Sequence, residues 1–191
     1  MPVLYAMFMK DSQECTVKLY LPSYETCFVC GKKNPNGLRL CFYIEDGRVT
    51  SEFSPREELC GFSGVLHGGI ISSIIDETLW WSSAVGAERL VLTRNLRLTY
   101  LRPVVVGKSY RVEADPPQPE GRHYLCRGRI VERAGAVCVK GEGSYSPLRW
   151  GKNRYPPDLL AYVDESGNPL PEERFYRFPM PGHRGSGLSP V

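Results

Sequence analysis

The sequence predicts an α+β domain in which one long helix packs against an antiparallel sheet. Two stretches with strand-like alternation come first, one long helical stretch follows, and four more strand-like stretches complete the domain. Strands that follow one another directly favour antiparallel pairing within one sheet. We expect an N-terminal extension over residues 1–26, the α+β domain over 27–147 and a C-terminal extension rich in proline and glycine over 148–191.

The first two strands are predicted on either side of Asp46-Gly47, a dipeptide that favours hairpin turns. Every second residue before the turn is apolar, which is the period of a strand with one buried face; these residues are Leu38, Leu40, Phe42 and Ile44. The alternation continues after the turn as far as Phe53, and a loop is expected over 55–65.

The long helix is predicted from Ile70 to about Val85, with Gly86 as its C-cap. On a helical wheel, apolar side chains cover most of the circumference, so we expect the sheet to enclose much of this helix. Asp76 falls on the small polar stripe, whereas Glu77 points among the apolar residues.

Four further strands are predicted after the helix, over 90–102, 104–114, 122–133 and 136–146. Pro103, a proline-rich loop at 116–121 and Ala134-Gly135 separate them. Turn-forming residues between runs of alternating character are typical of consecutive strands in an antiparallel sheet.

The composition excludes several classes of protein. The chain has 24 Lys and Arg against 21 Asp and Glu, and this excess of +3 is too small and too scattered to indicate nucleic-acid binding. No apolar run reaches the roughly 18 residues that a membrane span needs. The first nine residues make a poor secretory signal, and the odd number of cysteines, 7, fits reduced thiols, so we expect a cytoplasmic protein.

Cys27 and Cys30 have the spacing of half a zinc knuckle. A structural zinc site needs four ligands, usually from a second close pair of Cys or His, and the sequence contains no such pair. We therefore expect no metal here and interpret the two cysteines as a local turn with its thiols packed inward.

His67-Gly68-Gly69 precedes the helix. The first amides of a helix lack intrahelical partners and lie at the positive end of its dipole, so they could stabilise a carbonyl oxygen that gains negative charge. Asp76 lies seven residues beyond Gly69, on the order of 10 Å along one helix. That separation is too large for one reaction centre, so we expect a second subunit to supply one of the two groups.

The order of these motifs resembles the hotdog-fold acyl-CoA thioesterases of the PaaI-like branch. The segments that carry the resemblance are Cys27 to Gly31, Asn34 to Leu38, Gly64 to Ile71, Asp76-Glu77 and Tyr100 to Val104. The resemblance implies a hotdog fold, in which a curved antiparallel sheet wraps one long helix. It also implies homodimers or homotetramers with active sites at the dimer interface.

For the site, the resemblance implies that Asp76 is the catalytic carboxylate, which acts either as nucleophile or as general base. It also implies that the Gly68 amide polarises the thioester carbonyl. His67, Gly69 and Thr93 are then expected at the substrate or the attacking water. Coenzyme A is part of the substrate, and no cofactor or metal is implied. Gly61 stands where certain relatives carry Asn, so the acyl preference does not transfer.

Alternatives remain open from the sequence. Glu77 is the rival acid, and His67 either takes part in the reaction or orients the loop. An acyl-thioester dehydratase would use His67 for acid–base chemistry, and a non-catalytic hotdog module would only bind acyl-CoA. Cations that could contact the phosphates of coenzyme A are Arg94, Arg97, Arg102 and Lys108.

Overall fold

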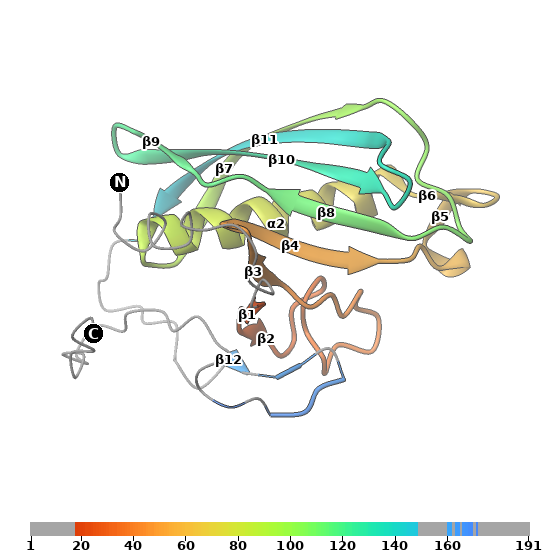
Figure 1. Cartoon of the computed structure of the whole chain (residues 1–191), viewed down its shortest axis with the longest axis horizontal. Helices are drawn as coiled ribbons and strands as arrows, with labels where there is room; N and C mark the ends of the chain where they lie inside the picture. Colours follow the sequence, from red (N-terminus) through yellow and green to blue (C-terminus); the bar gives the residue numbers. More distant parts are fainter. Residues whose placement is uncertain (1–17, 149–159, 162, 165, 170, 172–191) are drawn as a thin grey trace.

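The computed structural model describes residues 18–148, 160–161, 163–164, 166–169 and 171. The long helix α2 (Gly68–Ala87) lies along one face of an eight-stranded antiparallel sheet, which curves around it (Figure 1). This is the architecture that the sequence predicts. Most of the two predicted extensions lies outside the described residues.

The main sheet has the order β1-β3-β4-β8-β10-β11-β7, and β9 pairs with β10. Its strands are β1 (Leu19–Tyr20), β3 (Tyr43–Glu45), β4 (Arg48–Phe53), β7 (Val91–Tyr100), β8 (Tyr110–Ala114), β9 (Gln118–Glu120), β10 (His123–Glu132) and β11 (Val137–Pro147). Two small sheets accompany it, β2 (Ser23–Tyr24) with β12 (Leu160–Ala161) and β5 (Cys60–Phe62) with β6 (Val65–Leu66). Strand β7 therefore lies at one edge of the main sheet.

The core lies between α2 and the inner face of the sheet. Fully enclosed side chains from both layers are Ile75, Leu79, Val49, Val112, Ile130 and Val139. Burial of such a side chain contributes about 1.5–3 kcal/mol. Trp80 also fixes the last turns of α2, because its Nε1 donates to the Val91 carbonyl oxygen of β7 at 2.8 Å.

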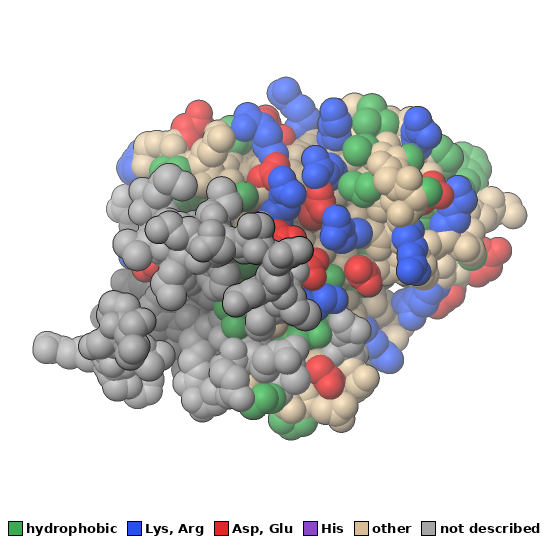
Figure 2. All heavy atoms as spheres, viewed as in Figure 1, with side chains coloured by type: hydrophobic (Ala, Val, Ile, Leu, Met, Phe, Trp, Pro, Cys, Tyr) green, Lys and Arg blue, Asp and Glu red, His purple; other side chains and the backbone are tan. Residues whose placement is uncertain are grey.

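The outer face of the sheet is charged. Figure 2 shows Lys and Arg side chains interspersed with Asp and Glu over this face. Several of these cations pair with carboxylates, as in Arg127–Glu142 at 2.7 Å and Arg48–Asp115 at 2.8 Å. The other face of the sheet packs against α2. No helix in the described part of the chain has the length and apolar character needed to cross a bilayer.

Several boundaries differ from the sequence prediction. The first predicted strand begins only at Tyr43, although Leu40, Phe42 and Ile44 are buried as the alternation requires. The predicted loop at 55–65 contains a short 3₁₀ helix (Glu57–Leu59) and most of the β5–β6 hairpin. The hairpin turn is confirmed, because Asp46 and Gly47 both adopt positive φ, 49° and 71°.

The end of the helix was also predicted wrongly. Gly86 lies inside its last turn, and the C-cap is Glu88, which adopts the left-handed conformation with φ 51°. The predicted strand 104–114 begins only at Tyr110. Residues 104–106 pair with the β5–β6 hairpin instead, since Leu66 N donates to Val104 O and Val106 N donates to Gly64 O.

Candidate active site

The start of α2 leaves one backbone donor open. His67 is the N-cap, and its Nδ1 accepts a hydrogen bond from Gly69 N at 2.9 Å. The His67 carbonyl oxygen accepts from Ile70 N and Ile71 N, at 3.0 and 3.1 Å. A helix begins with four N–H groups that need outside partners. Within the described part of the chain, Gly68 N–H is the one of these four without a hydrogen bond.

Gly68 lines a depression of about 610 Å³. The β5–β6 hairpin, the start of α2 and the end of β7 with the segment after it form its walls, which include Phe62, His67, Ile71, Tyr100, Leu101 and Arg102. Phe62 is 82% exposed and Leu101 is 50% exposed, so apolar surface faces solvent here. The open Gly68 amide thus lies beside a hollow with apolar walls, one of which carries a cation.

Tyr100 connects this end of β7 to the start of the helix. Its hydroxyl donates to the Gly68 carbonyl oxygen at 3.0 Å and lies 3.0 Å from Ser72 Oγ. Ser72 Oγ also donates to the Gly68 carbonyl oxygen, at 2.9 Å. These bonds hold the Gly68 peptide against β7. No sequence pattern assigns Tyr100 a role of its own.

The Asp76 carboxylate is half-buried between α2 and the sheet. Its Oδ1 accepts hydrogen bonds from Thr93 Oγ1 at 3.0 Å and from the Tyr145 hydroxyl at 3.1 Å. No hydrogen bond within the described residues uses Oδ2. Burial raises the pKa of Asp76 above the usual value, and the two hydrogen bonds oppose that rise. The two hydrogen bonds to Oδ1 thus orient the carboxylate, while Oδ2 is open to a ligand.

Tyr145 reaches Asp76 because Gly143 makes room for it. Both residues lie on the inner face of β11, where Tyr145 is fully buried. A Cβ on Gly143 would lie 2.7 Å from the Tyr145 hydroxyl oxygen, so a side chain there would displace the ring. Sequence reasoning missed Tyr145. The one available signal was its position on the buried side of the strand alternation.

The predicted site residues form two groups within one chain. His67, Gly68 and Gly69 meet at the start of α2, near Tyr100. Asp76 meets Thr93 at the other end of β7. Gly68 and Asp76 are eight residues apart on one helix, about 12 Å along its axis. The chain by itself therefore does not bring the carboxylate to the open amide.

Glu77, the rival acid, faces a different part of the molecule. The Cys27 thiol donates to Glu77 Oε1 at 3.6 Å, and Cys30 lies in the same cluster. Burial raises the pKa of Glu77 to about 8. Sequence reasoning placed Glu77 correctly among apolar residues but did not foresee that the two cysteines contact it.

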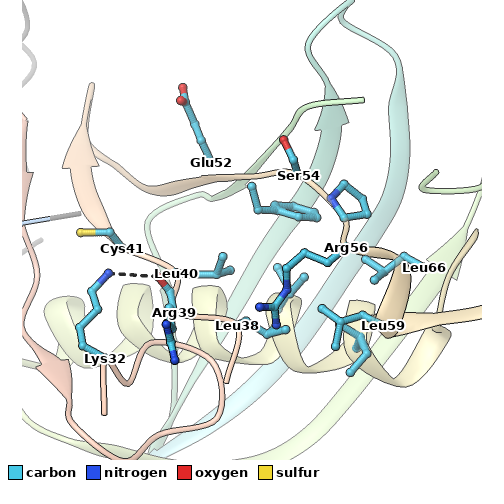
Figure 3. Close-up of a pocket in the computed structure, with 14 residues that line it drawn as sticks. Lys32, Leu38, Arg39, Leu40, Cys41, Glu52, Ser54, Arg56, Leu59 and Leu66 are labelled. Atoms are coloured by element: carbon cyan, nitrogen blue, oxygen red, sulfur yellow. Dashed lines mark hydrogen bonds between the residues drawn. The ribbon is translucent and has the colours of Figure 1, made fainter. Parts of the chain in front are cut away.

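A second, smaller depression of about 260 Å³ lies between α2 and the segment before β3 (Figure 3). Its apolar walls include Leu38, Leu40, Leu59, Leu66, Ile70 and Ile74. Three cations also line it, Lys32, Arg39 and Arg56. Lys32 Nζ donates to the Arg39 carbonyl oxygen at 3.0 Å, and Arg56 pairs with Glu58 at 3.2 Å. This depression therefore combines apolar walls with positive charge, but it contains neither Gly68 nor Asp76.

The four cations considered from the sequence lie in different surroundings. Arg102 lines the depression beside Gly68. Lys108 pairs with Glu132 at 2.8 Å, and Arg94 and Arg97 are exposed along β7. Of the four, Arg102 alone lies at the hollow that contains the open amide.

Comparison with known proteins agrees with the fold. Residues 63–139, which contain α2 and β7, match the model of the thioesterase superfamily. An uncharacterized protein of Schizosaccharomyces pombe is 27% identical over 119 residues, covering 58% of this chain and 68% of the relative. A proposed esterase of Saccharolobus solfataricus is 28% identical over 107 residues, covering 56% and 76%.

Solved structures share the same architecture. A thioesterase superfamily protein of known crystal structure superposes with a TM-score of 0.59 at 22% identity, covering 71% of this chain and 72% of that one. The E. coli PaaI protein from the phenylacetic acid degradation operon gives a TM-score of 0.51 at 14% identity, covering 58% and 80%. The match to the superfamily model supports a function of the thioester hydrolase type. The chain therefore has the hotdog fold, and its residues 63–139 are similar to the thioesterase superfamily.

Proposed function

We propose that this protein hydrolyses an acyl-CoA thioester to a carboxylic acid and coenzyme A. Asp76 acts as general base on water or as nucleophile, and the Gly68 amide polarises the thioester carbonyl. The observation that carries the proposal is a pair of groups on α2 that have no hydrogen-bond partner among the described residues. One is Oδ2 of the oriented, half-buried Asp76 carboxylate, and the other is the Gly68 N–H beside the hollow.

These groups suffice for the chemistry. As a nucleophile adds to the carbonyl carbon, the oxygen becomes anionic and is stabilised by a backbone amide at the positive end of the helix dipole. A carboxylate whose pKa is raised by burial accepts a proton from water more readily near neutral pH. His67 is already engaged as the N-cap through Nδ1, which favours a positioning role for it over the acid–base role that a dehydratase needs.

A homodimer formed through β7 would complete the site. β7 is an edge strand with unpaired backbone groups on its outer side, a feature that promotes pairing with another strand. Thr93, which holds Asp76, and Tyr100, which holds Gly68, lie near opposite ends of this strand. Antiparallel pairing about a two-fold axis near the middle of β7 brings the Thr93 end of each copy to the Tyr100 end of the other. Each Asp76 then approaches the Gly68 amide of the second copy.

Thiol release from short, long and aromatic acyl-CoAs tests the activity. We expect turnover of at least one class, and a kcat about 10²- to 10⁴-fold lower for Asp76→Asn, because the amide cannot accept the proton. Asp46→Asn is the matched control, since Asn tolerates the positive φ of that exposed turn. Full activity in a folded Asp76→Asn protein would refute the assigned role. Turnover of a 3-hydroxyacyl thioester without thiol release would instead favour a dehydratase.

A further inference from the structure

A cluster of three ligand-type side chains lies against α2 and includes Glu77, the residue that follows Asp76. Cys27 and Cys30 come from the turn after β2, and Glu77 comes from the middle of α2. One sulfur from each cysteine and one carboxylate oxygen all lie within 4.8 Å of one another. The sequence separates Glu77 from the cysteines by about 50 residues, so the fold alone creates this cluster.

The backbone holds both sulfurs in place. Val29 N donates to Cys27 Sγ at 3.3 Å, and Tyr24 N donates to Cys30 Sγ at 3.4 Å. Gly31 lets the turn close tightly, because a Cβ there would lie 2.6 Å from the Cys27 backbone nitrogen. Hydrogen bonds that orient a ligand atom are the usual support of metal ligands in proteins. The turn thus holds Cys27 Sγ and Cys30 Sγ close together without a bound ion.

Glu77 is half-buried, and no cation among the described residues pairs with its carboxylate. None of the ion pairs among the described residues includes it, and its side-chain hydrogen bond is with the Cys27 thiol, a weak donor. A buried carboxylate is costly unless it is paired or coordinates a metal. A Cys27–Cys30 disulfide would not supply a partner for the Glu77 carboxylate. Oxidation removes both thiol protons, so neither cysteine could then donate a hydrogen bond to Glu77.

We propose that Cys27, Cys30 and Glu77 bind a divalent metal ion that prefers thiolate ligands, zinc being the candidate. Two sulfurs and one carboxylate oxygen match the donors that zinc uses, and a water or another ligand would take the fourth position. The ion displaces the thiol protons to solvent, so the ligands bind as thiolates. It would fasten the turn at residues 27–31 to the central helix. The proposal does not rest on the proposed thioesterase activity, because among the described residues the hydrogen-bond partners of the Asp76 carboxylate are Thr93 and Tyr145 and not the three ligand side chains.

The experiment uses the full chain, purified in reducing buffer without chelator. We expect about one zinc per chain by elemental analysis, as one tetrahedral site requires. We also expect the chelated protein to bind Co²⁺ with the near-ultraviolet absorption of thiolate-to-cobalt charge transfer. Glu77→Gln keeps the size of the side chain but removes the charge, and should weaken zinc binding by about 10- to 100-fold or more. Cys27→Ser removes one of the two thiolates, so the charge-transfer absorption should fall to about half of the wild-type intensity or lower.

The chain offers a matched control at Cys60, whose Sγ lies 3.7 Å from Glu57 Oε2 but has no second cysteine beside it. Cys60→Ser and Glu57→Gln should leave zinc content and the cobalt spectrum unchanged. Absence of zinc together with a featureless cobalt spectrum for the wild-type chain would overturn the proposal. Equal zinc binding by Glu77→Gln and wild type would also overturn it. The cobalt spectrum of the wild-type chain tests the metal site even if a variant fails to fold. None of these measurements depends on thioester hydrolysis, so they are separate from the test of the proposed activity.

Discussion

Two hydroxyl groups orient the Asp76 carboxylate, and both reach the same oxygen. Thr93 is on β7 and Tyr145 is on β11, so the carboxylate is held from two adjacent strands. A hydrogen bond to a charged group contributes about 1.5–3 kcal/mol. Loss of either hydroxyl should therefore leave the Asp76 carboxylate in place as the proposed base but less well oriented.

Tyr145→Phe tests this positioning role. We expect a kcat about 10- to 100-fold lower with little change in KM, because the missing hydrogen bond acts on Asp76 and not on the bound substrate. The lost bond favours the ionised form, so its removal raises the pKa of Asp76 further and moves the acid limb of the rate profile to higher pH. A pH profile identical to that of the wild type would argue that Tyr145 only fills space.

The first turn of α2 is the element on which the proposed oxyanion interaction depends. Three of its four initial N–H groups are satisfied by His67, and Gly68 N–H is open. Proline is well tolerated at the first position of a helix, where its missing N–H costs no intrahelical bond. His67 has φ −60° and ψ 136°, an extended conformation that a following proline accepts. Gly68→Pro thus removes one donor with little disturbance of the helix.

For Gly68→Pro we expect kcat to fall by about 10²- to 10³-fold, the cost of one oxyanion donor. Gly68→Ala keeps the N–H, and its Cβ would make an ordinary contact with the Tyr100 hydroxyl at 3.6 Å. The alanine variant should therefore retain most of the activity. Similar kinetics for the two variants, with helix content preserved by circular dichroism, would contradict the role of the amide.

The elements also show what sequence patterns can and cannot predict. The helix and the succession of strands along the chain follow from periodicity, because one buried face imposes the same spacing on any sequence. Strand ends depend on partners, as at residues 104–106, where hydrogen bonds to the β5–β6 hairpin replace pairing in the main sheet. Tyr145 and the contact of Glu77 with Cys27 depend on residues 69 and 50 positions apart, which no local pattern reports.

In the proposed mechanism, the two groups of site residues come from two copies of the chain. Within one chain the Asp76 carboxylate and the Gly68 amide lie near opposite ends of edge strand β7. A two-fold dimer through this edge contains two equivalent sites, each built from Asp76 of one copy and Gly68 of the other. Sedimentation should accordingly show a dimer or a multiple of it.

Mixing two inactive variants tests the shared site most directly. Asp76→Asn and Gly68→Pro chains carrying different affinity tags are co-expressed, and dimers holding both tags are purified. Each mixed dimer has one site with both substitutions and one with neither, so we predict about half of the wild-type activity per dimer. Thiol release no higher than that of either variant alone, from dimers shown to contain both chains, would contradict a site shared between two copies.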